Sequence, residues 1–424
     1  MSEPGSTASP AGPESATDTH TPRDVVDRAA SLSFLLLAAA LPWSIAPMSI
    51  GVVLCAALTL LAWWLPGDGG ARVRWYRTPI DVPALVWMAA LVIATIFALE
   101  PARSAPRIEK GLLFAVIPLA AWHARDPRTA RRAVAILLVS AVFATIYALV
   151  RFEHEGGAFP ARVRGLVGHP LTYGGQATLL ATIAMALVLF GPDRRWRVGG
   201  GAFLVLLLPA LLGSGTRSAW IATFAAACVL IARRRARWLA ILGALAVAGL
   251  FLLPSGYRSR ALSWRAFDPN AYWNQERLYL WDAGRRMFLD HPVTGVGLQD
   301  LSALYDRYKS PNAHESHGHL HDVVIQVGAT MGVVGLVALV FLVTGFFRAA
   351  GRDWRAPIPP GRFRSVLRAA AVAALTGFLV AGIFEWNLGD EELVDFLCVV
   401  IGMGYAASLW PGTMERWPDR PRSS

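Results

Sequence analysis

Charged residues are scarce in this sequence. Only 16% of the 424 residues are Asp, Glu, Lys or Arg, whereas 55% are hydrophobic. A soluble chain of this length would show amphipathic periods separated by polar loops. Here, apolar runs of about 17 to 25 residues recur, long enough to cross a bilayer as helices. Because the lipid core admits only helices or closed barrels, we predict an all-α integral membrane protein.

Cysteine is also rare, and no cleavable signal peptide is evident in the sequence. The three cysteines, Cys55, Cys228 and Cys398, all fall within apolar runs, which indicates small buried side chains and not disulfides or metal ligands. Residues 1–30 are rich in Ser, Thr, Pro and Gly and lack an apolar core. We therefore predict a disordered N-terminus over 1–30, followed by a first span that acts as an uncleaved signal.

Twelve apolar segments follow one another along the chain. They are 31–47, 49–65, 79–99, 106–123, 131–150, 169–190, 197–212, 217–232, 237–254, 321–346, 366–386 and 393–410. We predict that each forms a transmembrane helix. Nine then lie within 31–254 and three within 321–410, with a long loop at 255–320 and a tail at 411–424. The loop contains aromatic residues, arginines and Pro-Gly features, so we expect it to be folded.

The distribution of basic residues predicts the orientation. The net charge is +11, but alternating the connections between two sides leaves only 15 of the 40 Lys and Arg residues on one side. Eight of those 15 lie in the long loop. The positive-inside rule places the other side, with both termini, in the cytoplasm. The positive charge is thus mainly an orientation signal, and we expect no nucleic-acid partner.

Arginines on the outer side oppose this bias and need another explanation. Arg162 and Arg164 lie in "FPARVRGLVGHP", Arg217 lies in "LLGSGTRSAW", and Arg265 and Arg277 lie in the long loop. The forked guanidinium group suits phosphate and carboxylate, so these arginines are candidates for binding an anionic lipid headgroup. The alternatives are a snorkelling pair at 162 and 164, and an exposed ion pair between Arg277 and its acidic neighbour, Glu276.

Histidines are concentrated in one stretch. "HESHGHLH" (314–321) holds four of the nine histidines. If this stretch were helical, His314, His317 and His321 would share a face suited to zinc, but the HExxH spacing is absent. We favour acid–base chemistry by His319 or His321, because both adjoin an apolar segment whose helix start would attract an anion. His314 and His317 are predicted to be bystanders, and no metal or other cofactor is expected.

Two local patterns make further predictions. "NQERLYLWDAGRRMFLD" (274–290) has apolar residues at helical spacing, namely Leu278, Trp281, Phe288 and Leu289, and predicts an amphipathic helix within the loop. Gly328 and Gly332 have the GxxxG spacing, which predicts close packing of the tenth apolar segment against another helix.

Several motifs together resemble the O-antigen ligase and O-antigen polymerase superfamily, which includes protein O-oligosaccharyltransferases. They are "RGLVGHPLTYGG" (164–175), "GSGTRSAW" (213–220), "ERLYLWDAGRRMFLDHPVTGVGLQDL" (276–301) and "HLHDVVIQVGATMGVVGL" (319–336). With the predicted spans and the loop, the resemblance covers most of the chain. Asp322 stands where the family usually has Asn, and a carboxylate there would raise the basicity of a neighbouring His.

The resemblance implies a membrane glycosyltransferase of the GT-C type in the bacterial inner membrane. Its donor would be a glycan on undecaprenyl diphosphate, and its acceptor a sugar hydroxyl of the lipid A–core. Transfer would occur at the periplasmic face, without a metal and with inversion. By position, Arg164, Arg217 and Arg277 would hold the diphosphate, and His321, in preference to His319, would act on the acceptor hydroxyl.

An acidic stretch adds two supporting candidates. "FEWNLGDEELVDFL" (384–397) places Glu385 and Asp390 between the last two apolar segments. They are expected to orient an Arg or a His, or to bind sugar. The other interpretation is a simple polar cap between two spans.

Competing functions remain open at this point. A polymerase or a protein O-oligosaccharyltransferase would share the motifs, and we favour a ligase because one dominant loop precedes the tenth apolar segment. A transporter of lipid-linked polysaccharide or of an anion would need polar groups at mid-depth. The predicted spans supply few of these, namely Gln176, Thr178 and Gln326.

Overall fold

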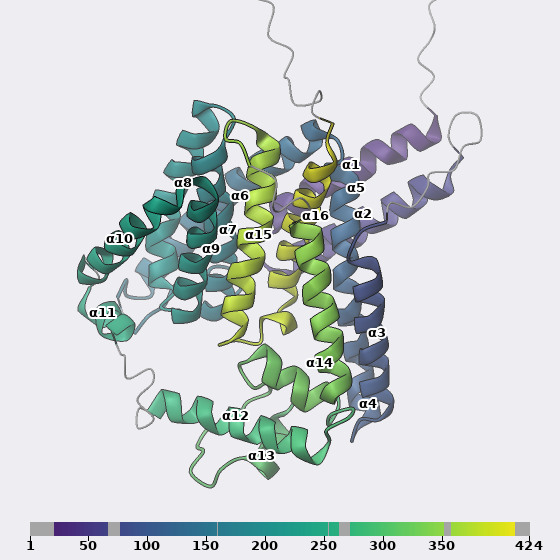
Figure 1. The fold of residues 1–424 in the computed structure, drawn as a ribbon, viewed down its shortest axis with the longest axis vertical. Helices are drawn as coiled ribbons and strands as arrows, with labels where there is room; N and C mark the ends of the chain where they lie inside the picture. The colour runs from purple at the N-terminus through teal and green to yellow at the C-terminus, as the bar shows by residue number, and fades with distance from the viewer. Residues whose placement is uncertain are drawn as a thin grey trace, which may run out of the picture.

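The computed structural model of the chain describes residues 21–66, 77–158, 160–252, 254–262, 272–351 and 358–411. Within these ranges every regular element is a helix (Figure 1). The α-helices are α1 (Pro22–Ala40), α2 (Ile45–Trp64), α3 (Asp81–Ile96), α4 (Pro101–Ser104), α5 (Val116–Ala124), α6 (Pro127–His154), α7 (Pro170–Phe190), α8 (Arg194–Gly213), α9 (Arg217–Arg235), α10 (Leu239–Leu252), α11 (Ser255–Leu262), α12 (Tyr272–Asp290), α13 (Ser302–Tyr308), α14 (Val323–Ala350), α15 (Phe363–Gly382) and α16 (Glu391–Leu409). Three 3₁₀ helices join them: η2 (Ala105–Ala115), η3 (Ala236–Trp238) and η5 (Asn387–Gly389).

Seven helices of the described ranges are long and apolar enough to cross a membrane. They are α2, α6, α7, α8, α14, α15 and α16, and α3 is a shorter apolar helix. The all-helical, multi-span class predicted from the sequence is therefore present. The number of twelve spans stays a prediction, since the predicted segment 106–123, for example, is divided between η2 and α5.

The first helix begins earlier than predicted. Thr21 caps α1: its side chain accepts a hydrogen bond from the Asp24 N–H at 3.3 Å, and the Asp24 carboxylate accepts one from the Thr21 N–H at 3.1 Å. This reciprocal pair satisfies two N–H groups that a helix start otherwise leaves unpaired. Residues 22–30, assigned above to a disordered N-terminus, are therefore helical, and residues 1–20 lie outside the described ranges.

Three helices form the centre of the bundle. α15 packs against α7, α9 and α16, and most of the apolar stretches of α7, α15 and α16 are buried within the protein. Small residues allow the close approach: Gly402 of α16 lies against the backbone of α5, and Gly404 lies against the backbone of α15. This packing fixes the start of α7, the end of α15 and the start of α16 relative to one another.

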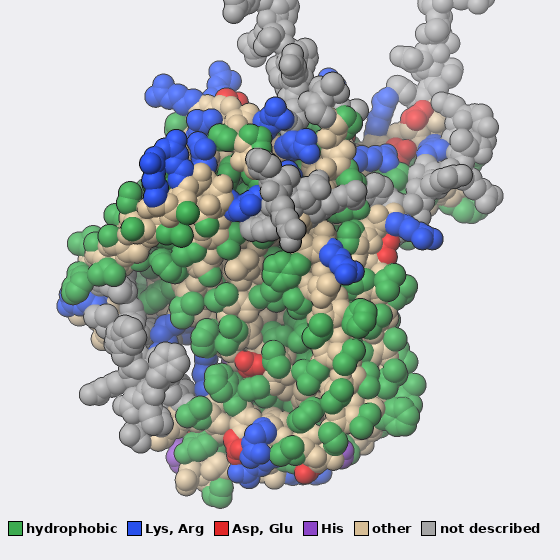
Figure 2. All heavy atoms as spheres, viewed as in Figure 1, with side chains coloured by type: hydrophobic (Ala, Val, Ile, Leu, Met, Phe, Trp, Pro, Cys, Tyr) green, Lys and Arg blue, Asp and Glu red, His purple; other side chains and the backbone are tan. Residues whose placement is uncertain are grey.

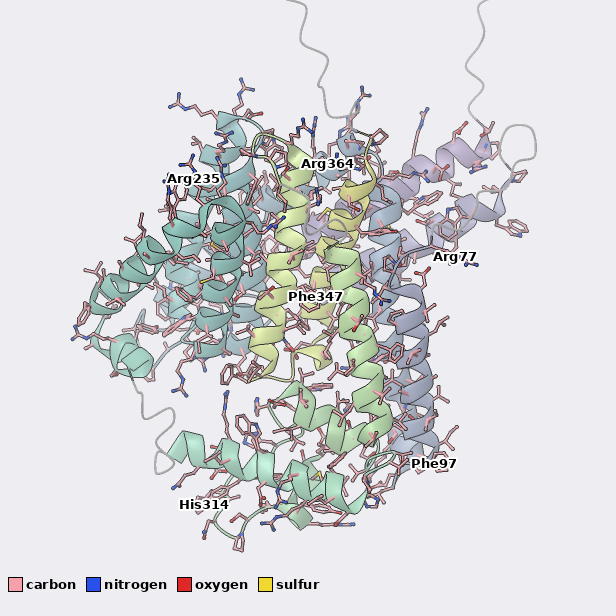
Figure 3. The ribbon with its side chains drawn as sticks, in the orientation of Figure 1. Arg77, Phe97, Arg235, His314, Phe347 and Arg364 are labelled. Atoms are coloured by element: carbon pink, nitrogen blue, oxygen red, sulfur yellow. The ribbon has the colours of Figure 1, made fainter. Side chains whose placement is uncertain are left out.

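The two ends of the bundle differ. Figure 3 places Arg235 and Arg364 at one end and His314 and Phe97 at the other, which we call the histidine end. In Figure 2, the larger group of Lys and Arg side chains on the visible face lies over the end that carries Arg235 and Arg364. This is the charge asymmetry from which the orientation was predicted.

The long loop contains helices α11, α12 and α13, and α12 and α13 lie at the histidine end (Figure 1). The predicted helix is present as α12, but its buried face is made by Leu280, Ala283 and Met287. Leu278 and Leu289, which belonged to the predicted apolar stripe, are 46% and 58% exposed. Trp281 of the predicted stripe does pack against this buried cluster, but Leu278 and Leu289 do not, because α12 packs on α13 and on the start of α14, contacts that the helical period alone does not reveal.

The helix α14 is broken at Gly332, whose φ is +61°. The segment 292–297 lies across this break and bonds to the backbone on both sides of it. Val296 N donates to Ala329 O at 2.9 Å, Gly297 N to Thr330 O at 3.0 Å, Val333 N to Pro292 O at 2.8 Å, and Val334 N to Val293 O at 3.2 Å. The segment thereby satisfies backbone groups freed by the break. Gly332 therefore leaves room for the segment 292–297. The GxxxG spacing had instead predicted packing against another helix.

Gly332→Ala is expected to destabilise the protein by about 1–3 kcal/mol, the usual cost of a strained backbone conformation. A Cβ atom at this position would also collide with the backbone of Pro292 and Val293. The matched control is Gly328→Ala, one helical turn away, where the nearest neighbour of an added Cβ is 3.6 Å distant. The measurement is the thermal midpoint of unfolding in detergent, and equal midpoints for the two variants would contradict the proposed role of Gly332.

Candidate active site

Glu385 joins two predicted site residues from distant parts of the chain. Its Oε2 atom lies 3.0 Å from Nδ1 of His321, and its Oε1 atom accepts a hydrogen bond from Nη2 of Arg277 at 2.9 Å. Arg277 belongs to α12, His321 directly precedes the cap of α14, and Glu385 follows α15. The side chains of Glu385 and His321 are only 13% and 14% exposed. The structure thus assembles a largely buried Arg–Glu–His array at the histidine end.

The charge state of Glu385 fixes the tautomer of His321. Burial by itself would raise the pKa of this carboxyl, but the hydrogen bond to His321 and the charge of Arg277 outweigh burial and lower the pKa below its usual range. An ionised carboxylate only accepts hydrogen bonds, so Nδ1 of His321 is the donor. The lone pair of a neutral His321 ring is then on Nε2, the nitrogen that faces away from Glu385.

The histidine-rich stretch is a loop and not a helix. His321 has φ +51°, the only positive value among the described non-glycine residues, and α14 begins at Val323. Asp322 caps this helix, accepting a hydrogen bond from Ile325 N at 2.7 Å, and burial raises its pKa. The helical face proposed for a zinc site is therefore absent. The carboxylate against His321 is Glu385, which was expected to orient an Arg or a His, and not Asp322, to which a raised basicity of the neighbouring His was assigned.

The other histidines of the stretch 314–321 lie at different distances from His321. The ring centroids of His319 and His321 are 4.3 Å apart, and those of His317 and His321 are 5.5 Å apart. Burial, with a smaller effect of the His321 charge, lowers the pKa of His319 to about 4, so its ring is neutral near pH 7. His317 contacts Glu315 at 2.9 Å, and its predicted role as a bystander stays a prediction. His314 is exposed at the edge of the loop region (Figure 3).

A cavity of about 450 Å³ lies beside the array. The first turns of α7, α9, α14 and α16 all contribute to its wall, through Thr172, Ser218, Gln326 and Leu393. Unpaired N–H groups at helix starts favour an anion. Other polar residues around it are Arg107, Lys110, His169, Gln299, Asp300, His319, Glu385, Asn387 and Asp390. The cavity therefore combines the cationic Arg107 and Lys110 with the carboxyl groups of Asp300, Glu385 and Asp390.

The other predicted arginines that the structure describes occupy separate positions. Arg162 donates to Ser214 O at 2.7 Å and to the Thr216 hydroxyl at 2.9 Å, and thereby fixes the turn before α9. Arg217 is the first residue of that helix and is half-buried. Arg164 instead pairs with Glu155 at 2.8 Å. Arg265 lies outside the described residues.

Asp390 also reaches the cavity, as its place in the sequence suggested. Its Oδ2 atom accepts a hydrogen bond from the Thr172 hydroxyl at 3.2 Å. Burial, strengthened by the neighbouring charge of Glu392, raises the pKa of Asp390 to about 6. Lys110 contacts the start of α16, which begins at Glu391. Its Nζ atom donates to Gly389 O at 2.6 Å and lies 3.6 Å from the Glu391 carboxylate.

Sequence reasoning missed four residues that line the cavity: Arg107, Lys110, His169 and Trp386. Arg107 and Lys110 fall within a predicted membrane span, where ionisable residues usually have a function, and that signal was available. His169 lies in a quoted motif as the N-cap of α7, and burial together with the charge of Arg162 lowers its pKa. Among the described residues, no group of three or more His, Cys, Asp or Glu side chains is arranged to hold a metal ion.

The helices and this site define a multi-pass membrane protein with an acid–base array next to a cavity that is lined by both cationic and acidic side chains. Residues 202–340 match the model of a protein family described as O-antigen ligase, so this part of the chain is similar to that family. The matched stretch contains Arg217, Arg277 and His321 but not Glu385. The comparison with curated proteins gave no match.

Proposed function

We propose that the protein is an O-antigen ligase. It transfers a glycan from undecaprenyl diphosphate to a sugar hydroxyl of the lipid A–core at the periplasmic face of the bacterial inner membrane. The observation that carries the proposal is the Arg277–Glu385–His321 array at the rim of the cavity, in a chain that matches the O-antigen ligase family. A glycosyl transfer to a hydroxyl needs a base for that hydroxyl and positive charge for the leaving diphosphate, and the array and cavity supply both.

His321 is proposed as the base. Its Nε2 atom accepts the proton of the acceptor hydroxyl while the hydroxyl oxygen attacks the anomeric carbon of the donor. The bond between that carbon and the diphosphate oxygen breaks, and undecaprenyl diphosphate leaves with the electron pair. A single displacement of this kind inverts the anomeric configuration. Glu385 keeps the His321 ring in the required tautomer and stabilises the imidazolium that forms.

The diphosphate is proposed to bind where positive charge converges. Arg107 and Lys110 line the cavity itself, whereas Arg277 is hydrogen-bonded to Glu385 of its wall and Arg217 directly precedes Ser218 of its wall. The four helix starts add partial positive charge. A diphosphate is already a good leaving group, so this arrangement requires no metal ion. Arg162 would act indirectly by fixing the turn that carries Arg217, and the contact of Arg164 with Glu155 gives it a role in the neighbouring loop.

The test uses purified protein in detergent with a lipid-diphosphate-linked glycan and lipopolysaccharide that ends at the core. Long-chain lipopolysaccharide is expected, with the same yield in the presence of EDTA. Elongated lipid-diphosphate glycan without transfer to the core would identify a polymerase. No product from either acceptor would overturn the proposal, and a loss in EDTA that zinc restores would overturn the metal-free mechanism. In cells, deletion should leave lipopolysaccharide core without long chains, whereas loss of a polymerase leaves core bearing a single repeat unit.

Arg217→Ala is expected to lower the transfer rate by about 10²–10³-fold, the usual effect of removing a group that stabilises developing charge. The protein should still insert, because Arg217 lies at the mouth of α9 and not in its apolar middle. The matched control is Arg235→Ala at the other end of the same helix (Figure 3). Initial rates at saturating substrate are compared at equal amounts of inserted protein. If both variants transfer at the wild-type rate, Arg217 has no role in charge stabilisation.

A further inference from the structure

The turn between α15 and α16 carries an aromatic side chain that the transfer chemistry above leaves unused. Trp386 directly follows Glu385 in the sequence and lines the cavity together with Asn387, Gly389 and Asp390. It is half-buried, so part of its indole ring packs on the protein and part faces the cavity. The cavity is lined by both polar and apolar side chains, and Trp386 places an aromatic surface directly beside the polar groups of the turn, an arrangement that diphosphate binding does not require.

The turn is rigidly held on both sides. Asn387 donates from Nδ2 to Phe378 O at 2.7 Å, which ties the turn to α15. Lys110 donates to Gly389 O at 2.6 Å, which ties it to η2. Gly389 lies so close to the Trp386 indole that an added Cβ would overlap the ring. The orientation of the indole is therefore fixed before any ligand binds, which lowers the entropic cost of binding.

The chemistry around the indole suits a sugar ring. A pyranose has an apolar face of C–H groups and a rim of hydroxyls. An indole ring offers a large apolar surface for that face. Asp390, a few residues along the same turn, points a carboxylate at the same cavity and uses one oxygen for the Thr172 hydroxyl. A carboxylate has further lone pairs that accept hydrogen bonds from sugar hydroxyls.

We propose that Trp386 and Asp390 form a pyranose-binding subsite that holds the sugar at the transfer point, with the indole against its apolar face and the carboxylate on its hydroxyls. The inference rests on the proposed function, because the sugar must lie within reach of His321 and Glu385. Two sugars have this chemistry: the first residue of the donor glycan and the terminal residue of the acceptor core. The subsite holds one of them, and substrate kinetics identify which.

The test measures KM for donor and acceptor separately in Trp386→Leu, Trp386→Phe and Asp390→Ala. Trp386→Leu is expected to raise KM for one substrate about tenfold, equivalent to about 1.4 kcal/mol, with a smaller change in kcat. Trp386→Phe should restore most of the affinity, since it keeps an aromatic face. Asp390→Ala should raise KM for the same substrate. The matched control is Trp64→Leu, which removes an 81% exposed tryptophan of α2.

A binding measurement separates this inference from the proposed function. The probes are the glycan released from the donor and the deacylated core oligosaccharide, each tested for thermal stabilisation of the purified protein. The wild type should be stabilised by one probe, and Trp386→Leu should lose that stabilisation. If neither probe stabilises the wild type, or if Trp386→Leu retains the effect, the subsite is wrong. If a probe binds as expected but no transfer occurs, the proposed function alone fails.

Discussion

His321→Asn is expected to lower the rate of glycan transfer by about 10²–10⁴-fold, the contribution usual for a positioned general base. Asn is chosen because His321 has φ +51°, and Asn adopts this backbone region more readily than most residues. The start of α14 should keep its position, since Asp322 still caps it. The measurement is the initial transfer rate at saturating donor and acceptor, with the thermal midpoint of unfolding as the check on folding.

Two neighbouring histidines supply the controls. His314→Ala should transfer at nearly the wild-type rate, because that residue is exposed at the edge of the loop. His319→Ala should have an intermediate effect through the ring that it packs against His321, 4.3 Å away. Added imidazole should partly restore the His321→Ala variant. If His319→Ala abolishes transfer while His321→Asn stays active, the assignment of the base is reversed.

The sequence predicted the helical class, the residues of the array and an orienting role for Glu385, but not which arginine and which histidine Glu385 contacts. Glu276 and Arg277 were considered as an ion pair because they are adjacent. Neighbouring residues on a helix do not face each other. Glu276 is buried and accepts hydrogen bonds from the backbone N–H groups of His314 and Glu315, at 3.1 and 3.4 Å. Arg277 reaches Glu385, 108 residues away along the chain, a contact that no local pattern encodes.

The same reason explains the errors around α14. Asp322 was expected to act on a histidine because it follows one in the sequence, but a carboxylate just before a helix is better used as its cap. Gly332 was expected to serve helix packing because of its spacing, but the segment 292–297 occupies that position. In both cases a sequence pattern singled out the residue. Its contacts in the folded protein, which the pattern does not show, determined its structural role.

Glu385→Gln is expected to lower the transfer rate by about 10²–10⁴-fold, close to the effect of replacing His321. The amide has the same size as the carboxylate but carries no charge. It can donate to His321 as well as accept, so the tautomer with the lone pair on Nε2 is no longer enforced, and the imidazolium loses its counter-charge. The measurement is kcat at saturating substrates, and a wild-type kcat would contradict an orienting role for Glu385.

Arg277 makes this prediction more specific. Arg277 and Glu385 share a hydrogen bond of 2.9 Å. The effects on kcat of replacing each residue should therefore not add. Arg277→Ala leaves a largely buried carboxylate with His321 and the Ser218 hydroxyl, 3.4 Å away, as its hydrogen-bond partners, and favours transfer of the ring proton to Glu385. In a double-mutant cycle with Glu385→Gln, the coupling energy in kcat is expected to be about 0.5–3 kcal/mol. Strict additivity would mean that Arg277 acts only on the diphosphate, independently of the Glu385–His321 pair.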